Sequence, residues 1–294
     1  MRVAAVQYEV GRAHSLADFV GRVRGLTERA ARDGAELVQF PEYICVDLIP
    51  ELVRRSVVAA EYDLREALSR LPDLNSELFE ELASVASSCG VVLGAGTYLE
   101  QADDGKAHNA AQVFTPDGRH VSQAKMHVAY EMVANAADVS AGAELAVWEA
   151  GGARIVTLVC YDAQFPESGR AVLDHAGAVD LMLVPGCALE PWGITRMRTA
   201  AAARAMESFA FVVTAHLVGV VPNPREKPIS FYGESAVFGP ASRPFSVGGV
   251  VADSGTRGET IVMADLDISV LRQSRAAGFP KAGDRRPSLP VRQV

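Results

Sequence analysis

The segment Ile155-Val-Thr-Leu-Val-Cys160-Tyr-Asp-Ala-Gln-Phe-Pro166-Glu decides how the chain folds around Cys160. Its first five residues are apolar or β-branched, which predicts a buried strand. Pro166 suits the first turn of a helix, because its fixed φ is already helical. We therefore expect Cys160 on a sharp turn from strand to helix. Such a thiol is either a nucleophile, whose neighbouring N–H groups hold an oxyanion, or a buried structural cysteine; this segment alone leaves both open.

The composition excludes several classes of protein. With 294 residues, 49% hydrophobic and 22% charged, the chain can bury a large core and resembles an ordinary globular protein. Its formal net charge of −8 argues against a nucleic-acid partner, which requires a basic surface. No segment approaches the ~18 uninterrupted apolar residues of a membrane span, and the N-terminus lacks a signal-peptide pattern. The four cysteines lie far apart without metal-ligand spacing, so we expect a reduced, cytoplasmic protein.

Strands and helices alternate along the chain, which predicts an α/β fold. We find no linker and no internal repeat, so residues 1–294 are expected to form a single domain, with an extended tail from about residue 275 to residue 294. The expected helices follow Ser15 and Pro166 and cover 76–88 and 192–208. The expected strands cover 4–8, 36–40, 91–98, 111–115, 145–149, 153–160, 180–185, 209–217, 234–238 and 260–265, and a further strand runs from His120 to about residue 125.

Three ionisable residues follow apolar strands at the points where the chain turns: Glu42, Lys125 and Cys160. Strand ends of one α/β sheet converge on one edge, where such folds place ligand sites. A carboxylate there can accept the thiol proton, and an ammonium can stabilise both a thiolate and an oxyanion. Each residue alone is better explained as a turn residue, a surface charge or core filler. The three together favour a catalytic group.

Three motifs with the same order and spacing resemble those of the nitrilase superfamily of carbon–nitrogen hydrolases: Phe40-Pro-Glu42-Tyr43, Ala124-Lys125-Met-His127 and the Cys160 segment. Further resemblance lies in Arg204-Ala-Met-Glu207, Gly233-Glu-Ser235 and the C-terminal tail, so it covers nearly the whole chain.

The resemblance implies a four-layer αββα sandwich with Glu42, Lys125 and Cys160 as the catalytic triad. It implies that Cys160 attacks the substrate carbon, that Glu42 is general base and acid, and that Lys125 with the backbone N–H of Tyr161 holds the oxyanion. It implies no metal and no cofactor. Many relatives carry a second glutamate in the pocket, for which Glu131 is the nearest match. Other candidates for the pocket lining are Tyr43, Tyr130, Cys187, Trp192 and Tyr232.

The resemblance also implies a homodimer or higher homo-oligomer, with the helix from Pro166 and the C-terminal tail as contact surfaces. For the substrate, carbamoylase-like relatives carry arginines shortly after the cysteine, where this chain has Ala163 and Gln164. This favours a small-molecule amide that releases ammonia, with water as the acceptor. Alternatives that share the triad are a nitrilase, an N-carbamoyl amide hydrolase and an acyl transferase. A catalytically silent binding or scaffold protein is the alternative outside enzymes.

Two histidines and one aspartate near these motifs are expected to be structural. His127 and His216 raise the alternative of a Cys–His pair, but we expect His127 to serve as a hydrogen-bonding neighbour. Asp162, two residues after Cys160, is expected to brace the turn rather than to move protons.

Overall fold

The computed structural model describes residues 1–101, 105–128 and 137–278, in which strands and helices alternate as the sequence predicts. The strands are β1 (Arg2–Val10), β2 (Leu37–Gln39), β3 (Val92–Gln101), β4 (Ala107–Phe114), β5 (His120–Ala124), β6 (Val139–Ser140), β7 (Val147–Ala150), β8 (Ala153–Thr157), β9 (Leu181–Gly186), β10 (Phe211–Val221), β11 (Ile229–Phe231), β12 (Ala236–Phe238), β13 (Val250–Asp253) and β14 (Thr260–Asp265). The α-helices are α1 (Leu16–Arg32), α2 (Ile49–Arg54), α3 (Leu64–Arg70), α4 (Asn75–Cys89), α6 (Pro166–His175), α7 (Pro191–Ser208) and α8 (Ile268–Ala276), and short 3₁₀ helices η1 (Ile44–Leu48), η2 (Leu71–Leu74) and η3 (Cys160–Gln164) join them.

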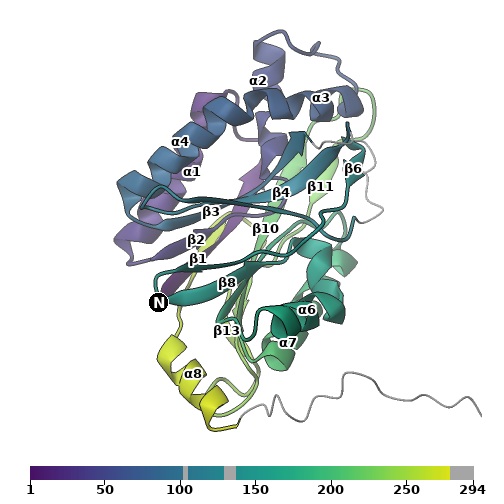
Figure 1. Ribbon diagram of the computed structural model, residues 1–294. Coiled ribbons are helices and arrows are strands. Elements are labelled where there is room, and N and C mark those ends of the chain that lie inside the picture. The colour runs from purple at the N-terminus through teal and green to yellow at the C-terminus, as the bar shows by residue number, and fades with distance from the viewer. Residues whose placement is uncertain (102–104, 129–136, 279–294) are drawn as a thin grey trace, which may run out of the picture.

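The strands form two halves that meet where β1 pairs in parallel with β10. The order along the path is β5-β4-β3-β2-β1-β10-β9-β8-β7. In Figure 1, α1 and α4 lie on one side of the strands, and α6 and α7 lie on the other. The chain therefore stacks as helices, sheet, sheet and helices, which confirms the expected four-layer αββα sandwich.

The period-two alternation of β1 explains how one strand serves two layers, because successive side chains point to opposite faces. Ala4, Val6 and Tyr8 pack with the buried stripes of α1 and α4. Val3 and Ala5 instead pack between the sheets, against residues of β8, β9 and β10. A third buried cluster joins the other face of β8, β9 and β10 to α6 and α7.

The ends of the helices follow local sequence signals. Ser15 caps α1 by accepting a hydrogen bond from the Asp18 N–H. Gly90 ends α4 in the left-handed region, with φ +67°. Pro166 is the first residue of α6, as the sequence predicts.

Several boundaries differ from the sequence prediction, and two of them bear on the Cys160 turn and on the C-terminal end. β8 ends at Thr157 rather than at Cys160, because the chain is already turning into η3. The sequence predicts a tail from about residue 275, but residues 275 and 276 belong to α8, which Asp267 caps through the Val270 N–H. Residues 279–294 lie outside the described part of the chain.

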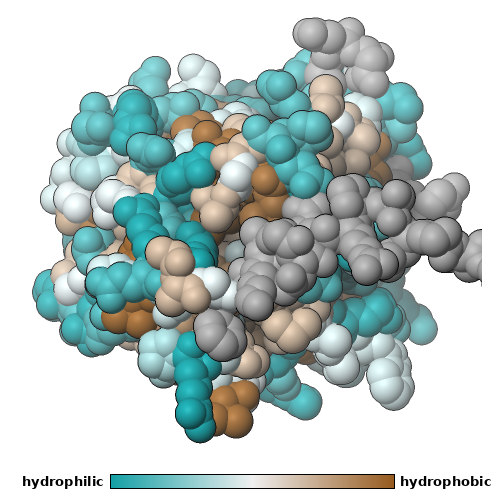
Figure 2. Space-filling model, turned by 60° about the horizontal axis from the view of Figure 1, so that its bottom comes forward, coloured by the Kyte–Doolittle hydropathy of each residue, from teal (hydrophilic) through white to brown (hydrophobic). Residues whose placement is uncertain are grey.

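The face in Figure 2 carries mostly hydrophilic side chains around separate apolar patches. Among the described residues, the exposed large hydrophobic side chains are Trp192, Met206, Val220, Tyr232, Val247, Val250 and Val251. No helix in the described part is both long and apolar enough to cross a membrane.

Candidate active site

The topology brings the three candidate residues to one edge of the fold. β1, β2, β3, β8, β9 and β10 are linked by parallel pairs, and β5 runs in the same direction because β4 is antiparallel to both β3 and β5. Glu42 follows the carboxyl end of β2, Lys125 follows β5, and Cys160 follows β8. This is the edge at which α/β sheets bind ligands.

Glu42 and Lys125 form a buried ion pair. The Lys125 Nζ lies 2.6 Å from the Glu42 Oε1, and both side chains are almost completely inaccessible to solvent. Asn109 donates a second hydrogen bond, of 2.8 Å, to the same oxygen. The Glu42 Oε2 makes no hydrogen bond to any described residue. The carboxylate therefore has one oxygen that is held in place and another that is available to accept a proton.

An irregularity of β3 at Gly96 fixes the backbone before Glu42. Gly96 has φ +87°, and a Cβ on it would lie 2.3 Å from the Pro41 carbonyl oxygen. The Thr97 N–H donates to that same carbonyl at 3.2 Å, and the Thr97 Oγ1 accepts from the Tyr43 N–H at 2.8 Å. Gly96 is required both for its backbone conformation and for this close approach.

Gly96→Ala is expected to destabilise the protein by about 3 kcal/mol, because it adds backbone strain and a clash with Pro41. Any folded fraction should also lose activity, since Glu42 follows Pro41 directly. Gly118→Ala is the matched control: Gly118 also has φ +87°, but nothing lies within 4 Å of its added Cβ. Thermal unfolding and turnover of both variants test this. Equal losses in the two variants would mean that the close contact with Pro41 is unimportant.

Cys160 occupies a strained turn. Its φ is +48°, in the left-handed region that residues other than glycine rarely adopt. The Sγ lies 3.6 Å from the Cys187 carbonyl oxygen and 3.8 Å from the Met197 Sδ. Arg204 supports the turn from α7 by donating a 2.8 Å hydrogen bond to the Ala163 carbonyl. Strain that is maintained by such contacts is typical of functional positions.

The two histidines differ in their surroundings. The His127 ring stacks on Phe165, and its Nδ1 lies 3.1 Å from the Asp162 Oδ1, which agrees with the expected hydrogen-bonding role. His216 is completely buried, and neither of its ring nitrogens bonds to a described residue. Burial, with a smaller effect of the Arg198 charge, lowers the pKa of His216 to about 4, so its ring is neutral at pH 7.

The residues predicted to line the pocket are placed differently. Tyr43 is fully buried in the core beside Glu42, and Cys187 presents its carbonyl to Cys160. Trp192 is 71% exposed at the start of α7, where it lines an outer groove with Gln164 and Arg196. Tyr232 is partly exposed and donates its N–H to the Ala188 carbonyl. Tyr161 packs edge-on against Phe165. Glu131 and Tyr130 lie outside the described residues.

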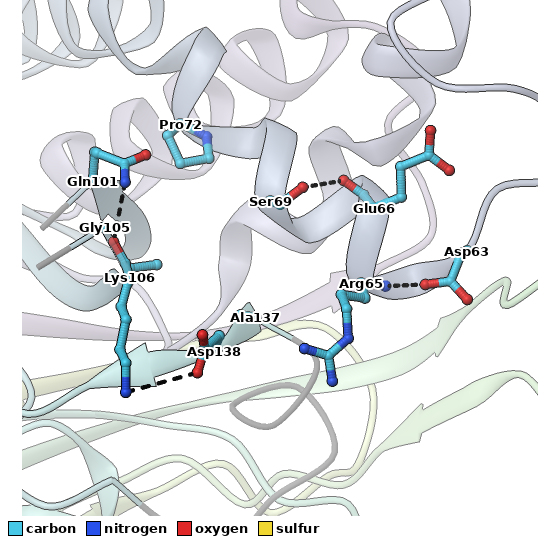
Figure 3. Close-up of a pocket in the computed structure, with 11 residues that line it drawn as sticks. Asp63, Arg65, Glu66, Ser69, Pro72, Gln101, Gly105, Lys106, Ala137 and Asp138 are labelled. Atoms are coloured by element: carbon cyan, nitrogen blue, oxygen red, sulfur yellow. Dashed lines mark hydrogen bonds and ion pairs between the residues drawn. The ribbon is translucent and has the colours of Figure 1, made fainter.

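A separate open pocket lies between α3 and the β3–β4 hairpin (Figure 3). Its charged groups have mixed signs, and several are engaged with one another or with the backbone. Lys106 lies 4.0 Å from Asp138, and Asp63 caps α3 through the Arg65 N–H. Among the described residues, the charged side chains that line this pocket thus include three acidic and two basic groups. Across the described residues, no group of three His, Cys, Asp or Glu side chains could hold a metal ion.

The sequence profile described as "Carbon-nitrogen hydrolase" matches residues 2–276. Among curated proteins, the chain is 26% identical to "Probable hydrolase YhcX" of Bacillus subtilis over 95% of this chain but only 52% of that protein. It is 28% identical to an omega-amidase of Xenopus tropicalis, over 93% of this chain and 91% of the relative. The chain thus spans about half of the first relative and nearly all of the second.

Solved structures share the fold. A carbon–nitrogen hydrolase from Helicobacter pylori superposes with a TM-score of 0.76 at 20% identity, over 97% of this chain and 95% of that one. A cysteine-to-serine mutant of an amidase of the nitrilase superfamily from Nesterenkonia superposes with a TM-score of 0.68 at 22% identity, over 94% and 95% of the two chains.

Proposed function

The chain belongs to the carbon–nitrogen hydrolase family within the nitrilase superfamily, and we propose that it hydrolyses a small-molecule amide and releases ammonia through a thioester on Cys160. The observation that carries this proposal is the buried pair of Glu42 and Lys125 at the same sheet edge as the strained Cys160.

In the proposed reaction, Glu42 accepts the thiol proton as the Cys160 sulfur attacks the amide carbon. Lys125 and the Tyr161 N–H hold the oxyanion of the tetrahedral intermediate. Glu42 then gives its proton to the leaving nitrogen, so that ammonia departs and a thioester remains. Glu42 then deprotonates a water molecule, which attacks the thioester carbon. The C–S bond breaks, the carboxylic acid leaves, and the proton on Glu42 returns to the Cys160 sulfur. No metal or cofactor takes part in these steps.

Known proteins with this fold support the choice of substrate. The Nesterenkonia amidase has been solved in complex with butyramide, and with an acetamide moiety joined covalently to its active-site cysteine. In this chain, residue 163 is a buried alanine, and the Gln164 Nε2 lies against the Met197 Sδ. These neutral side chains favour an uncharged amide over an N-carbamoyl amino acid. A nitrile, or an acceptor other than water, would use the same triad.

The test is ammonia release from a panel of small aliphatic amides, ω-amides, nitriles and N-carbamoyl compounds. We expect ammonia from at least one amide, none with Cys160→Ala, and unchanged release with Cys89→Ala, a free cysteine at the end of α4, as the control. Cys45 provides an internal reference for alkylation, because burial raises the pKa of its thiol to about 12. No ammonia from any compound, together with a Cys160 that iodoacetamide modifies as slowly as Cys45, would favour the silent scaffold.

We also propose a homodimer that meets through α6 and α7, near the cysteine motif. Trp192 and Met206 of α7 are exposed, and Ala200 and Ala203 line the outer groove beside Trp192. Light scattering should give a mass in solution of twice 31.3 kDa, and the mass of a monomer would contradict this assembly.

We also propose that the protein is located in the cytoplasm, because a reducing compartment would keep Cys160 as a thiol.

A further inference from the structure

The Asp162 carboxylate is completely buried and accepts hydrogen bonds from two separate segments of the chain. From its own turn it accepts the Val159 N–H at 3.0 Å. From the segment after β5 it accepts the Met126 N–H at 3.1 Å and the His127 N–H at 2.7 Å, as well as the His127 ring. One side chain therefore joins the two segments.

Two of these N–H donors belong to residues that are next in sequence to candidate catalytic residues. Val159 immediately precedes Cys160, and Met126 immediately follows Lys125. The nucleophile and the ammonium come from different strands, so their separation is not fixed by any single element. Asp162 is a direct link between their backbones, because both neighbouring N–H groups bind one carboxylate. The Lys125 backbone is held on its other side, where its N–H donates to Asn109 and its carbonyl accepts from Gly142.

We propose that Asp162 is a positioning residue that holds the Lys125 ammonium in register with the Cys160 thiol, a role that rests on the function proposed above. Asp162 acts through the backbone and touches no reacting atom in this role. A displacement of about 1 Å between catalytic groups can lower a rate by about 100-fold, so such a link has a large effect on turnover.

The close partners of Asp162 suit its role as a hydrogen-bond acceptor. Each of its close partners is an N–H donor, which a carboxylate satisfies and a protonated acid does not. Burial raises the pKa of Asp162, and the hydrogen bonds from His127 and Met126 and the charge of Lys125 offset only part of this rise. The His127 ring is itself held between Asp162 and Phe165, which completes the contact between the two segments.

Asp162→Asn tests this role, with Asp180→Asn as the matched control. Asp180 is equally buried and accepts hydrogen bonds from the Arg154 N–H, Arg272 and Arg275, but it lies at the opposite end of β9 from Cys187. Both variants should melt at lower temperature than the wild type, because each loses a bound buried carboxylate.

Asp162→Asn alone should lower kcat by about 100-fold, with a much smaller change in KM. It should also slow alkylation of Cys160 by iodoacetamide at pH 7 by roughly tenfold, with a smaller loss at high pH, where the thiol ionises without help from Lys125. Asp180→Asn should match the wild type in both measurements below its melting temperature. A wild-type kcat and a wild-type alkylation profile in Asp162→Asn would overturn the inference.

If Asp162→Asn does not fold, the variant His127→Phe tests the positioning role of Asp162 instead. That variant keeps the stack on Phe165 and the backbone N–H, and loses one hydrogen bond to Asp162. We expect a several-fold fall in kcat, and a wild-type kcat would overturn the inference. A failure of the proposed function can be distinguished from a failure of this inference, because in the first case the wild type itself would release no ammonia from any amide.

Discussion

Glu42→Gln is expected to lower kcat by about a thousandfold or more, because it removes the group that accepts the thiol proton and returns it to the leaving nitrogen. The amide is nearly isosteric with the carboxylate and can keep the hydrogen bond from Asn109, so KM should change much less than kcat. Turnover of the best amide from the substrate panel, measured by ammonia release, gives both constants.

The control for this variant is Glu51→Gln. Glu51 is another buried carboxylate, and it binds Arg54, Arg55 and the Leu16 N–H rather than any candidate catalytic group. These partners lower the pKa of Glu51 to about 2, so it is ionised at neutral pH. Glu51→Gln should lose stability and keep its kcat. A Glu42→Gln enzyme that retains more than about a tenth of wild-type kcat would contradict the role of Glu42 as general base.

Lys125→Met is expected to lower both stability and activity. It leaves the buried Glu42 carboxylate without its ionic partner, which should cost about 3–5 kcal/mol of unfolding free energy. It also removes the ammonium that holds the oxyanion, which should lower kcat by about 100- to 1,000-fold. Urea unfolding and ammonia release measure the two effects separately.

The double variant Glu42→Gln/Lys125→Met separates these effects. Because both charges are removed together, it should recover much of the stability that Lys125→Met loses, while its activity falls below that of Glu42→Gln. Losses of stability that simply add would show that the two groups do not interact in solution. An activity equal to that of Glu42→Gln would mean that Lys125 serves the fold rather than the chemistry.

Much of this architecture could be predicted from the sequence because local signals agree with the fold. The apolar stripe of α1 after Ser15, the stop at Gly90 and the start of α6 at Pro166 all lie where residue chemistry places them. The order of the layers cannot be predicted from such local signals, since no local pattern indicates that β1 pairs with β10. It came from the resemblance of the spaced motifs to a known family.

The supporting contacts of the site were not predictable in the same way. Gly96 matters because Pro41 approaches it from another strand, and Asn109 matters because its side chain reaches Glu42 across the sheet. Such contacts join residues far apart in sequence, and no periodicity marks them. The sequence does indicate that Asp162 braces its turn, but its bonds to Met126 and His127 appear only in the folded chain. Trp192 is a candidate for the pocket because it is aromatic, and its exposure beside Gln164 and Arg196 appears only in the folded chain.

The most direct test of the account is the mass of the intact protein, quenched within the first turnovers after mixing with a short aliphatic amide such as butyramide. The account predicts a species heavier by one acyl group, with the added mass on the peptide that contains Cys160, formed together with one equivalent of ammonia and absent from Cys160→Ala. Ammonia release by Cys160→Ala at the wild-type rate, or an acyl group on any other residue, would contradict the account.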